Sequence, residues 1–446
     1  MRIDVPKKVQ EIISVLQEHG YDAYAVGGCV RDSLLGVLPA DWDITTSARP
    51  YQVKELFSRT LDTGITHGTV TVMLGKEGFE VTTYRIDGEY EDGRHPKEVV
   101  FTGELLEDLR RRDFTINAMA YNDREGVIDA FGGIEDLHAG IIRCVGNPEE
   151  RFQEDALRIL RAFRFAGQLG FSIEENTLQA AAKLAENLKK ISAERIAAEL
   201  GKTLVSKNPG ILRTAYEAGV TAVILPEFDR MMETGQNTPH HCYSVGEHTL
   251  KTLEYIPADK VLRYTMLLHD MGKPAAKVTD ANGRDHFKGH ETESEKLAGN
   301  ILHRLKLDND TIGKVKKLVR WHDSRQQPNP RIVRKAVNKI GKEMYPLLLQ
   351  VQYADTMAKS MYKREEKLDR IDKVQEIYEE ICREDQCVSL QDLEVNGKDL
   401  IQMGMKPGKE IGKMLEALLE EVLEEPSRNT KEYLLKRAEE KSRQNS

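Results

Sequence analysis

Two aspartates, Asp41 and Asp43, are separated by a single residue near the start of the 446-residue chain. Side chains two apart on a strand point the same way, so both carboxylates would face one spot while Trp42 and Ile44 face the core. Two like charges held this close repel and are costly to desolvate unless a cation lies between them. Oxygen ligands of this kind suit Mg²⁺, and the pair therefore predicts a magnesium site.

A glycine turn comes shortly before the aspartates. Gly27 and Gly28 follow a short apolar run, 23–26, expected to be a buried strand, and precede an expected helix over 30–35. Backbone N–H groups in such a turn can approach an anion, and Arg31 adds a charge-assisted contact. A phosphate cradle beside paired aspartates predicts phosphoryl or nucleotidyl transfer with two metal ions. Either feature alone would equally suit a plain turn or a polar strand edge.

The run Gly27-Gly28-x-x-Arg31-Asp32, followed by Asp41-x-Asp43, resembles the head of class II tRNA nucleotidyltransferases. These are the CCA-adding branch of the polymerase-β-like superfamily, which also includes bacterial poly(A) polymerases. The resemblance implies template-independent addition of CCA to the 3′ end of tRNA from CTP and ATP, with release of pyrophosphate. It assigns Mg²⁺ to Asp41 and Asp43, and the triphosphate to Gly28, Arg31 and Arg112.

Arg112-Asp113 is similar to the second motif of this family and precedes a small-residue segment, 114–121, expected to be a helix. Two strands are expected over 67–74 and 79–84, joined by a turn. Glu80 lies on the second strand and is the candidate for a third carboxylate bordering the metal site. A solvent-exposed glutamate is the alternative.

The segment 87–97 has two glycines, a proline and no periodicity, which predicts a loop. Within it, residues 92–96 resemble the flexible loop that CCA-adding enzymes use when they change from CTP to ATP. Enzymes that add only CC usually lack this loop. Its presence favours a protein that can add A.

The segment 148–170 starts with a proline and ends with a glycine, which predicts one helix with Asp155 and Arg158 on one face. A carboxylate that accepts from the amino group of C or A, with a guanidinium that donates to the ring nitrogen, would exclude U and G. An ordinary ion pair worth about 0.2–0.5 kcal/mol is the alternative. The pattern resembles the nucleotide-recognition motif of the family, which also implies that Arg161 and Arg164 contact phosphate or the tRNA 3′ strand.

Histidines gather in the second half of the chain. Six residues resemble, in order, the ligands of an HD-type metal phosphohydrolase: His248, His269, Asp270, His290, His322 and Asp355. Mixed imidazole and carboxylate ligands suit a transition metal such as Mn²⁺, Ni²⁺, Fe²⁺ or Zn²⁺. The resemblance implies hydrolysis of 2′,3′-cyclic nucleotides or phosphomonoesters. Related domains with decayed sites serve as RNA-binding scaffolds, which leaves activity open.

The elements that position these residues predict an α+β fold: a small polymerase-β-like head with a mixed sheet and helices, then a mainly α-helical neck, an HD-type body and a tail. The expected domains are a catalytic head, a nucleotide-recognition neck, an HD-type domain and a helical tRNA-binding tail, with bounds 1–147, 148–235, 236–361 and 362–446.

The composition, with 31% charged residues, indicates a soluble protein, and no apolar run is long enough to span a membrane. The first residues carry no apolar signal segment, so a cytoplasmic protein is expected. The five cysteines have neither zinc nor disulfide spacing and are expected to be reduced. A net charge of −8 argues mildly against a nucleic-acid partner, although a basic run over 314–342 is an exception.

Three other functions stay open at this point: an A-adding tRNA nucleotidyltransferase, a poly(A) polymerase and, from another class, an HD metal-dependent phosphohydrolase. The segment 64–69 after the aspartates looks more like the CCA-adding branch, and the intact aspartates argue against a purely hydrolytic protein. Oligomeric state is not predicted.

Overall fold

The computed structural model describes residues 2–87 and 99–444, so the expected nucleotide-exchange loop, 92–96, lies outside the described residues. The chain divides into two compact units, Met1–Asp229 and Arg230–Ser446. Their further division into four domains stays a prediction. No helix among the described residues is both long enough and apolar enough to cross a membrane.

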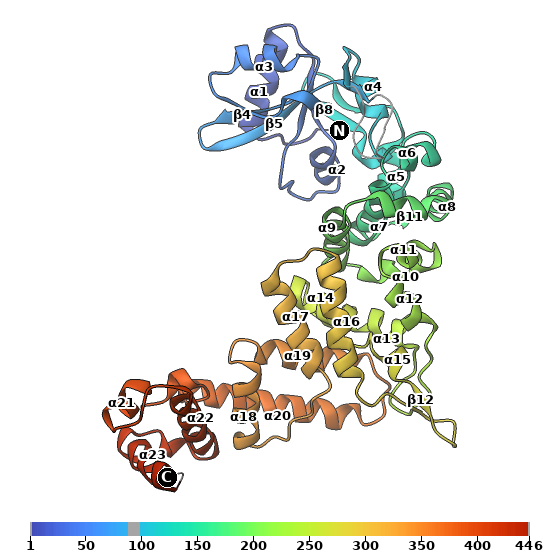
Figure 1. Ribbon diagram of the computed structural model, residues 1–446. Helices are drawn as coiled ribbons and strands as arrows, with labels where there is room; N and C mark the ends of the chain where they lie inside the picture. The colour runs from blue at the N-terminus through green and yellow to red at the C-terminus, as the bar shows by residue number, and fades with distance from the viewer. Residues whose placement is uncertain (1, 88–98, 445–446) are drawn as a thin grey trace. The chain divides into compact units, whose positions relative to one another are not determined.

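The first unit is built on a seven-stranded sheet in the order β3-β4-β5-β2-β1-β8-β9 (Figure 1). β2 and β5 are parallel and the other neighbours antiparallel, which confirms the mixed sheet. The strands are β1 (Ala23–Val26), β2 (Ile44–Thr46), β3 (Thr60–Gly64), β4 (Thr69–Leu74), β5 (Glu77–Thr83), β8 (Met119–Asn122) and β9 (Gly126–Asp129). All four residues of β1 are buried, as its uninterrupted apolar sequence predicts.

Short elements surround the sheet. A hairpin is formed by β6 (Arg85–Asp87) and β7 (Val99–Phe101), and a parallel pair by β10 (Ile141–Ile142) and β11 (Ser172–Ile173). The helices here are α1 (Lys7–Glu18), α2 (Gly28–Leu34), α3 (Pro50–Leu56), α4 (Leu105–Arg110) and α5 (Gly133–Ala139). The buried face of α1 consists of apolar residues at helical spacing, Val9, Ile12, Ile13 and Leu16.

The helix expected over 114–121 is wrong. A single 3₁₀ turn, Thr115–Asn117, is followed by β8, which pairs with β1 at Val26 and Ala120. This segment forms a strand because the backbone N–H and C=O groups on the side of β1 that faces away from β2 need hydrogen-bond partners.

The rest of the first unit is helical, with α6 (Pro148–Glu154), α7 (Leu157–Leu169), α8 (Glu175–Leu184), α9 (Ala193–Leu204), α10 (Leu212–Glu217), α11 (Val220–Ile224) and α12 (Pro226–Glu233), which runs across the division between the units. The single helix expected over 148–170 is wrong, because the chain breaks at Asp155 (φ −141°, ψ 104°). α7 packs against α9, and α6 against α8.

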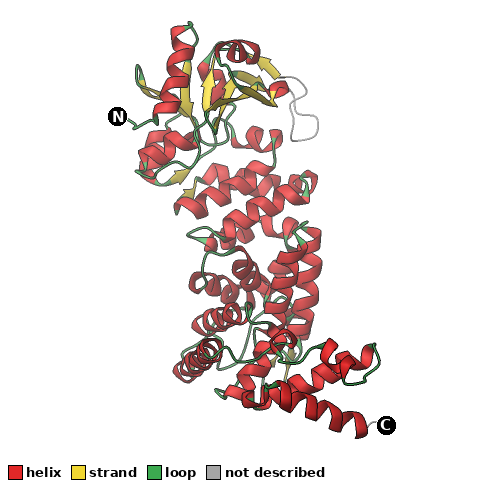
Figure 2. Ribbon diagram, turned by 90° about the vertical axis from the view of Figure 1, so that its left-hand side faces the viewer, coloured by secondary structure: helices red, strands yellow, loops and turns green. Residues whose placement is uncertain are grey.

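The second unit is almost wholly helical, as Figure 2 shows. It contains α13 (Val245–Tyr255), α14 (Lys260–Leu268), α15 (Lys273–Ala276), the hairpin β12 (Val278–Thr279) and β13 (Asp285–His286), α16 (His290–Arg304), α17 (Asn309–Trp321), α18 (Pro330–Ile340), α19 (Tyr345–Met357), α20 (Arg364–Arg383), α21 (Gly397–Gln402), α22 (Lys409–Glu424) and α23 (Lys431–Gln444).

Asn396 caps the start of α21, because its side chain accepts from two N–H groups of this helix. The five cysteines are free, as expected.

Candidate active site and candidate metal centre

Asp41 and Asp43 lie immediately before β2 and not within it, since the strand starts at Ile44. Both aspartates are exposed while Trp42 is half-buried and Ile44 is 1% exposed, so the predicted alternation of faces is present. The Asp43 carbonyl accepts a hydrogen bond from Val26 N (3.0 Å), which fixes this segment to the end of β1. Protein atoms around the Asp43 carboxylate displace part of its hydration and raise its pKa, the Arg112 guanidinium opposes the shift and the carboxylate of Asp41 adds to it. A cation would relieve this repulsion.

Glu80 is exposed on β5. The next residue, Val81, pairs with Ile44 in the parallel register of β5 and β2. Glu80, within β5, and Asp43, just before β2, therefore each come one residue before the paired Val81 and Ile44 of two neighbouring strands. A role for Glu80 beside the metal stays a prediction.

The glycine turn makes room for an arginine of the second motif. Gly27 has φ +81°, and a Cβ at this position would lie 2.9 Å from Arg112 Nη1. Among the described residues, the buried Nε of Arg112 has no hydrogen-bond partner, while its Nη2 lies 3.4 Å from Asp108 Oδ2. Arg31 is directed elsewhere: it is 9% exposed, and its Nη1 donates to Asn117 Oδ1 (2.6 Å). Its predicted triphosphate contact stays a prediction.

A pocket of about 270 Å³ opens beside Arg112, and its walls are mostly arginine. Its lining consists of Arg111, Arg112, Asp113, Asp155, Leu157, Arg158, Arg161 and Arg195. The structure thus brings together four of the predicted nucleotide-binding residues. Such a concentration of guanidinium groups suits a ligand with several phosphates.

Asp155 and Arg158 both line this pocket, but the prediction that they share one helix face is wrong. The Asp155 Oδ1 accepts from Leu157 N (2.9 Å) at the break between α6 and α7, and Oδ2 lies 2.7 Å from Arg195 Nη2. Arg158 is anchored separately by Glu154 and by the carbonyl of Arg111 (3.0 Å). The contact between Arg195 and Asp155 was not predicted from the sequence, because the two residues lie on helices far apart along the chain.

Arg161 and Arg164 occupy different environments. Arg161 Nε donates to Asp113 Oδ2 (2.7 Å), and its side chain is 34% exposed. Burial alone would raise the pKa of Asp113, but Arg161 and a hydrogen bond from Asn117 lower it to about 2. Arg164 is 7% exposed, paired with the buried Glu199. Arg161 is therefore the more accessible of the two, and a tRNA contact for either stays a prediction.

The second candidate site is a cluster in the second unit, here called the histidine centre, formed by His248, His269, Asp270, His290, His322 and Asp355. None of these residues is more than 7% exposed. They come from five separate places: α13, the end of α14, the start of α16, the end of α17 and α19. The structure thus brings together the whole set that the sequence singled out.

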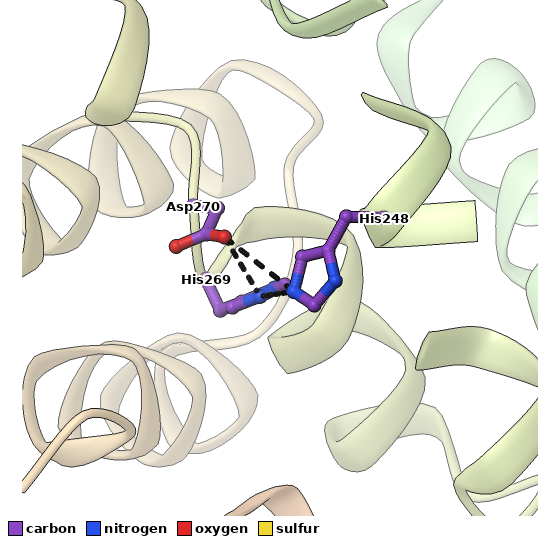
Figure 3. Close-up of side chains that lie close together, drawn as sticks. All are labelled: His248, His269 and Asp270. Atoms are coloured by element: carbon purple, nitrogen blue, oxygen red, sulfur yellow. Dashed lines mark hydrogen bonds and ion pairs between the residues drawn. The ribbon is translucent and has the colours of Figure 1, made fainter. Parts of the chain in front are cut away.

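Asp270 lies in the middle of the histidine centre. Its Oδ2 is 3.2 Å from His269 Nε2 and 3.7 Å from His248 Nε2, and Figure 3 shows these three side chains converging. Its Oδ1 is 3.3 Å from His290 Nε2 and 3.6 Å from His322 Nε2. Two groups of potential metal ligands therefore share one carboxylate.

Backbone contacts fix the direction of the imidazole lone pairs. Nδ1 lies 2.7 Å from the Met266 carbonyl in His269, 2.8 Å from that of Phe287 in His290 and 2.7 Å from that of Val319 in His322. A carbonyl only accepts, so each Nδ1 carries the proton and each neutral ring presents the Nε2 lone pair to the centre. His248 differs: its Nδ1 lies 3.4 Å from the Ala358 carbonyl, its Nε2 lies closer to Asp355 Oδ1 (3.0 Å), and burial lowers its pKa.

These lone pairs face one another. The Nε2 atoms of His248 and His269 are 3.4 Å apart, and those of His290 and His322 are 3.3 Å apart. Both carboxylate oxygens of Asp270 are buried, and among the described residues neither has a hydrogen bond of regular geometry, although Lys273 Nζ forms an ion pair with Oδ2 (2.7 Å). Two acceptors at this distance repel unless a cation accepts both lone pairs, so the donor set fits a transition metal.

Two buried lysines accompany the carboxylates. Lys273 Nζ lies 2.7 Å from Asp270 Oδ2 and 2.8 Å from Gln236 Oε1. Lys359, 8% exposed, pairs with Asp355, whose Oδ1 also lies 3.0 Å from His248 Nε2. Burial opposes ionisation of Asp270, but neighbouring positive charge, that of Lys273 included, outweighs it and holds the pKa of this carboxyl well below its usual value.

A cavity of about 630 Å³ opens onto one side of the histidine centre. Asp270, His290 and His322 line it, together with His240 and His241, which sequence reasoning left without a role. The ring of His241 lies 5.2 Å from that of His248. Clustering of histidines just before His248 was the available signal.

Three family models match this chain. They are the poly(A) polymerase head domain (residues 23–143), the probable RNA- and SrmB-binding site of polymerase A (170–232) and the putative domain 2 of tRNA nucleotidyltransferase (290–438).

A CCA-adding enzyme from Ligilactobacillus salivarius is 51% identical over 203 residues, 46% of this chain and 50% of that protein. The chain thus aligns with about half the length of this relative. One from Latilactobacillus sakei is 36% identical over 435 residues, 96% of each chain. The solved structure of the Bacillus stearothermophilus CCA-adding enzyme in complex with CTP is 30% identical, with a TM-score of 0.74 over 98% of this chain and 97% of that one.

Proposed function

Because the chain belongs to the family of CCA-adding enzymes, we propose that it adds CCA to the 3′ end of tRNA from CTP and ATP, without a template. The observation that carries the proposal is the position of Arg112. It lies against the glycine turn, acts electrostatically on Asp43 and lines the arginine pocket. A triphosphate held in the pocket would place its reacting end toward the aspartates. As an enzyme acting on tRNA, the protein would work in the cytoplasm.

Asp41 and Asp43 would hold Mg²⁺, which when bound neutralises the phosphates and favours attack by the tRNA 3′-hydroxyl. Gly28, Arg31 and Arg112 would contact the triphosphate, with Glu80 bordering the metal. Asp155 and Arg158 would select C or A by accepting from the exocyclic amino group and donating to the ring nitrogen. Because Asp155 is held by Arg195 and Arg158 by Glu154, the two base-reading groups are oriented independently and do not neutralise each other.

Extension of three tRNA transcripts tests this proposal. The transcripts end before CCA, after C and after CC, and each is incubated with CTP, ATP or both and resolved at single-nucleotide length. Addition of CCA followed by a stop supports it. Extension of only the CC-ended tRNA indicates an A-adding enzyme, and long A tails a poly(A) polymerase.

The metal assignment has its own test. Asp41→Ala should abolish addition while tRNA binding is retained, because the carboxylate holds the metal and not the RNA. Glu11→Ala, on the exposed side of α1, is the matched control. Addition by Asp41→Ala at a rate near that of the unchanged protein would reject the assignment.

We infer a second function, metal-dependent hydrolysis of phosphate esters at the histidine centre. The observation that favours it is the pair of facing Nε2 lone pairs beside a cavity. The test is hydrolysis of 2′,3′-cyclic AMP and of 4-nitrophenyl phosphate with Mn²⁺, Ni²⁺ or Co²⁺. His269→Ala should abolish it, while His303→Ala, exposed on α16, should not. If the His269→Ala variant still hydrolyses these esters, or if the unchanged protein hydrolyses neither with any of the three metals, the histidine centre is not a phosphohydrolase site. The domain would then serve as a scaffold.

A further inference from the structure

The histidine centre is asymmetric, and this inference rests on the second proposed function. Four donor atoms converge on one side, Nε2 of His248 and His269, Oδ2 of Asp270 and Oδ1 of Asp355; we call this the closed position. Of these four residues only Asp270 lines the cavity. Asp355 lines only a small pocket of about 20 Å³, so the closed position has little access to solvent, which is typical of a metal position that keeps its ion.

Three donor atoms converge on the other side, Oδ1 of Asp270 and Nε2 of His290 and His322; we call this the open position. All three residues line the cavity. Three protein ligands leave coordination sites for another molecule, which is typical of a position that binds a substrate.

The charge of the centre limits how many ions it can hold. The carboxylates of Asp270 and Asp355 are already balanced by the ammonium groups of Lys273 and Lys359, and the imidazoles are neutral. Among nearby charges, Asp323 is paired with Arg325 (3.0 Å), and Lys367, 8% exposed, adds a positive charge. With Lys367 the cluster starts near +1, so one divalent ion would bring it to about +3 and a second to about +5, which a site removed from water does not tolerate without an anion.

We propose that the two positions fill unequally: the closed position holds a divalent ion by itself, and the open position fills only together with the phosphate group of a ligand from the cavity. A phosphate dianion offsets the charge of the second ion and supplies its remaining ligands. Since such coupling is reciprocal, the ion also tightens the binding of phosphate. The centre would therefore hold one ion at rest and two when a phosphate ester is bound.

The probe is equilibrium dialysis of the full chain against Co²⁺, with and without inorganic phosphate, followed by elemental analysis of cobalt per chain. Asp41 and Asp43 can also take up Co²⁺, so the unchanged protein is compared with His290→Gln, which loses one ligand of the open position only. Without phosphate, both proteins should hold the same amount. With phosphate, the unchanged protein should gain one further ion, bound about 5–150-fold more tightly, the usual range of such coupling.

Lys359 tests the charge argument separately. Lys359→Gln should let the open position fill without phosphate, whereas Lys359→Arg should keep the phosphate requirement. The matched control is Lys363→Gln, whose side chain is 53% exposed. Circular dichroism checks the fold of each variant, and the comparison with His290→Gln decides the proposal even if Lys359→Gln is unfolded.

The outcomes separate this inference from the function on which it rests. Two ions without phosphate, or no additional ion with it, overturn the inference and leave the metal centre in place. If the unchanged protein holds no more cobalt than His269→Ala, the metal centre itself is wrong and the second function fails with it.

Discussion

Arg195→Gln tests how Asp155, the carboxylate proposed to select the nucleotide, is oriented. Asp155 is held at the break between α6 and α7 by two contacts, the N–H of Leu157 (2.9 Å) and the guanidinium of Arg195 (2.7 Å). The side chains of Arg195 and Asp155 are 22% and 17% exposed, so the contact is largely shielded. Loss of a hydrogen bond between charged groups costs about 1.5–3 kcal/mol. If that energy serves to orient Asp155, kcat/KM for CTP and ATP should fall about 10–150-fold.

The assay is single-turnover addition of CTP to a tRNA that lacks CCA and of ATP to a CC-ended tRNA, with UTP as the incorrect substrate. Selection of CTP over UTP should weaken, because UTP makes no use of a correctly placed Asp155. Lys202→Gln, exposed on the same helix, is the control and should change neither quantity.

A double-mutant comparison gives the refuting result. If Arg195 acts only through Asp155, the combined variant Asp155→Asn and Arg195→Gln should be no slower than Asp155→Asn alone. Additive losses, or an unchanged preference for CTP over UTP in Arg195→Gln, would show that Arg195 does not orient the base-reading group.

Three further outcomes are expected. Glu199→Gln leaves a buried arginine without its ionic partner and should lower the free energy of unfolding in urea by about 3–5 kcal/mol. The pKa of Asp113 is lowered to about 2, so its contribution to stability is full above about pH 4 and disappears as pH falls toward 2. In the Asp113→Asn variant, the free energy of unfolding should therefore depend less on pH in that window. Gly27→Ala should weaken nucleotide binding about tenfold by displacing Arg112, the equivalent of about 1.4 kcal/mol, whereas Gly36→Ala, also at positive φ but with no atom within 4 Å, should not.

Local patterns in the sequence were sufficient to predict most of the elements around Asp41 and Asp43. The apolar run 23–26 is a strand, the glycine pair is a turn with φ +81° at Gly27, and the alternation around Asp41 and Asp43 is present. These features depend on neighbouring residues only, so periodicity and backbone preference identify them. The strand itself begins later than predicted, at Ile44, because its start is set by pairing with β1 and β5.

Features set by distant residues were not predictable in this way. The window 148–170 has the ends of a helix and no proline inside, yet it breaks at Asp155, whose side chain caps α7 and contacts α9. The basic run over 314–342 also contains residues that are buried or paired, which the sequence does not show. Arg334 is 5% exposed and donates to carbonyls at the end of α22, and Lys335 is paired with Glu420 and Glu424. Tertiary partners bury or neutralise these charges, which the sequence alone does not show.

The negative charge of the carboxylates is offset in different ways at the two sites. In the first unit, Asp41 and Asp43 are open to solvent, and a hard cation held by oxygen ligands can arrive with the triphosphate whose charge it offsets. In the second unit, Asp270 and Asp355 are buried and each has a lysine beside it, so the carboxylates are balanced before any ion binds. Affinity there must come from the converging imidazole lone pairs, which a hard ion such as Mg²⁺ uses poorly. We therefore expect a chelator selective for transition metals to lower the melting temperature of the protein, because it removes the ion from the histidine centre. CCA addition in Mg²⁺ should continue under the same conditions. Equal loss of both properties would contradict this division of metals.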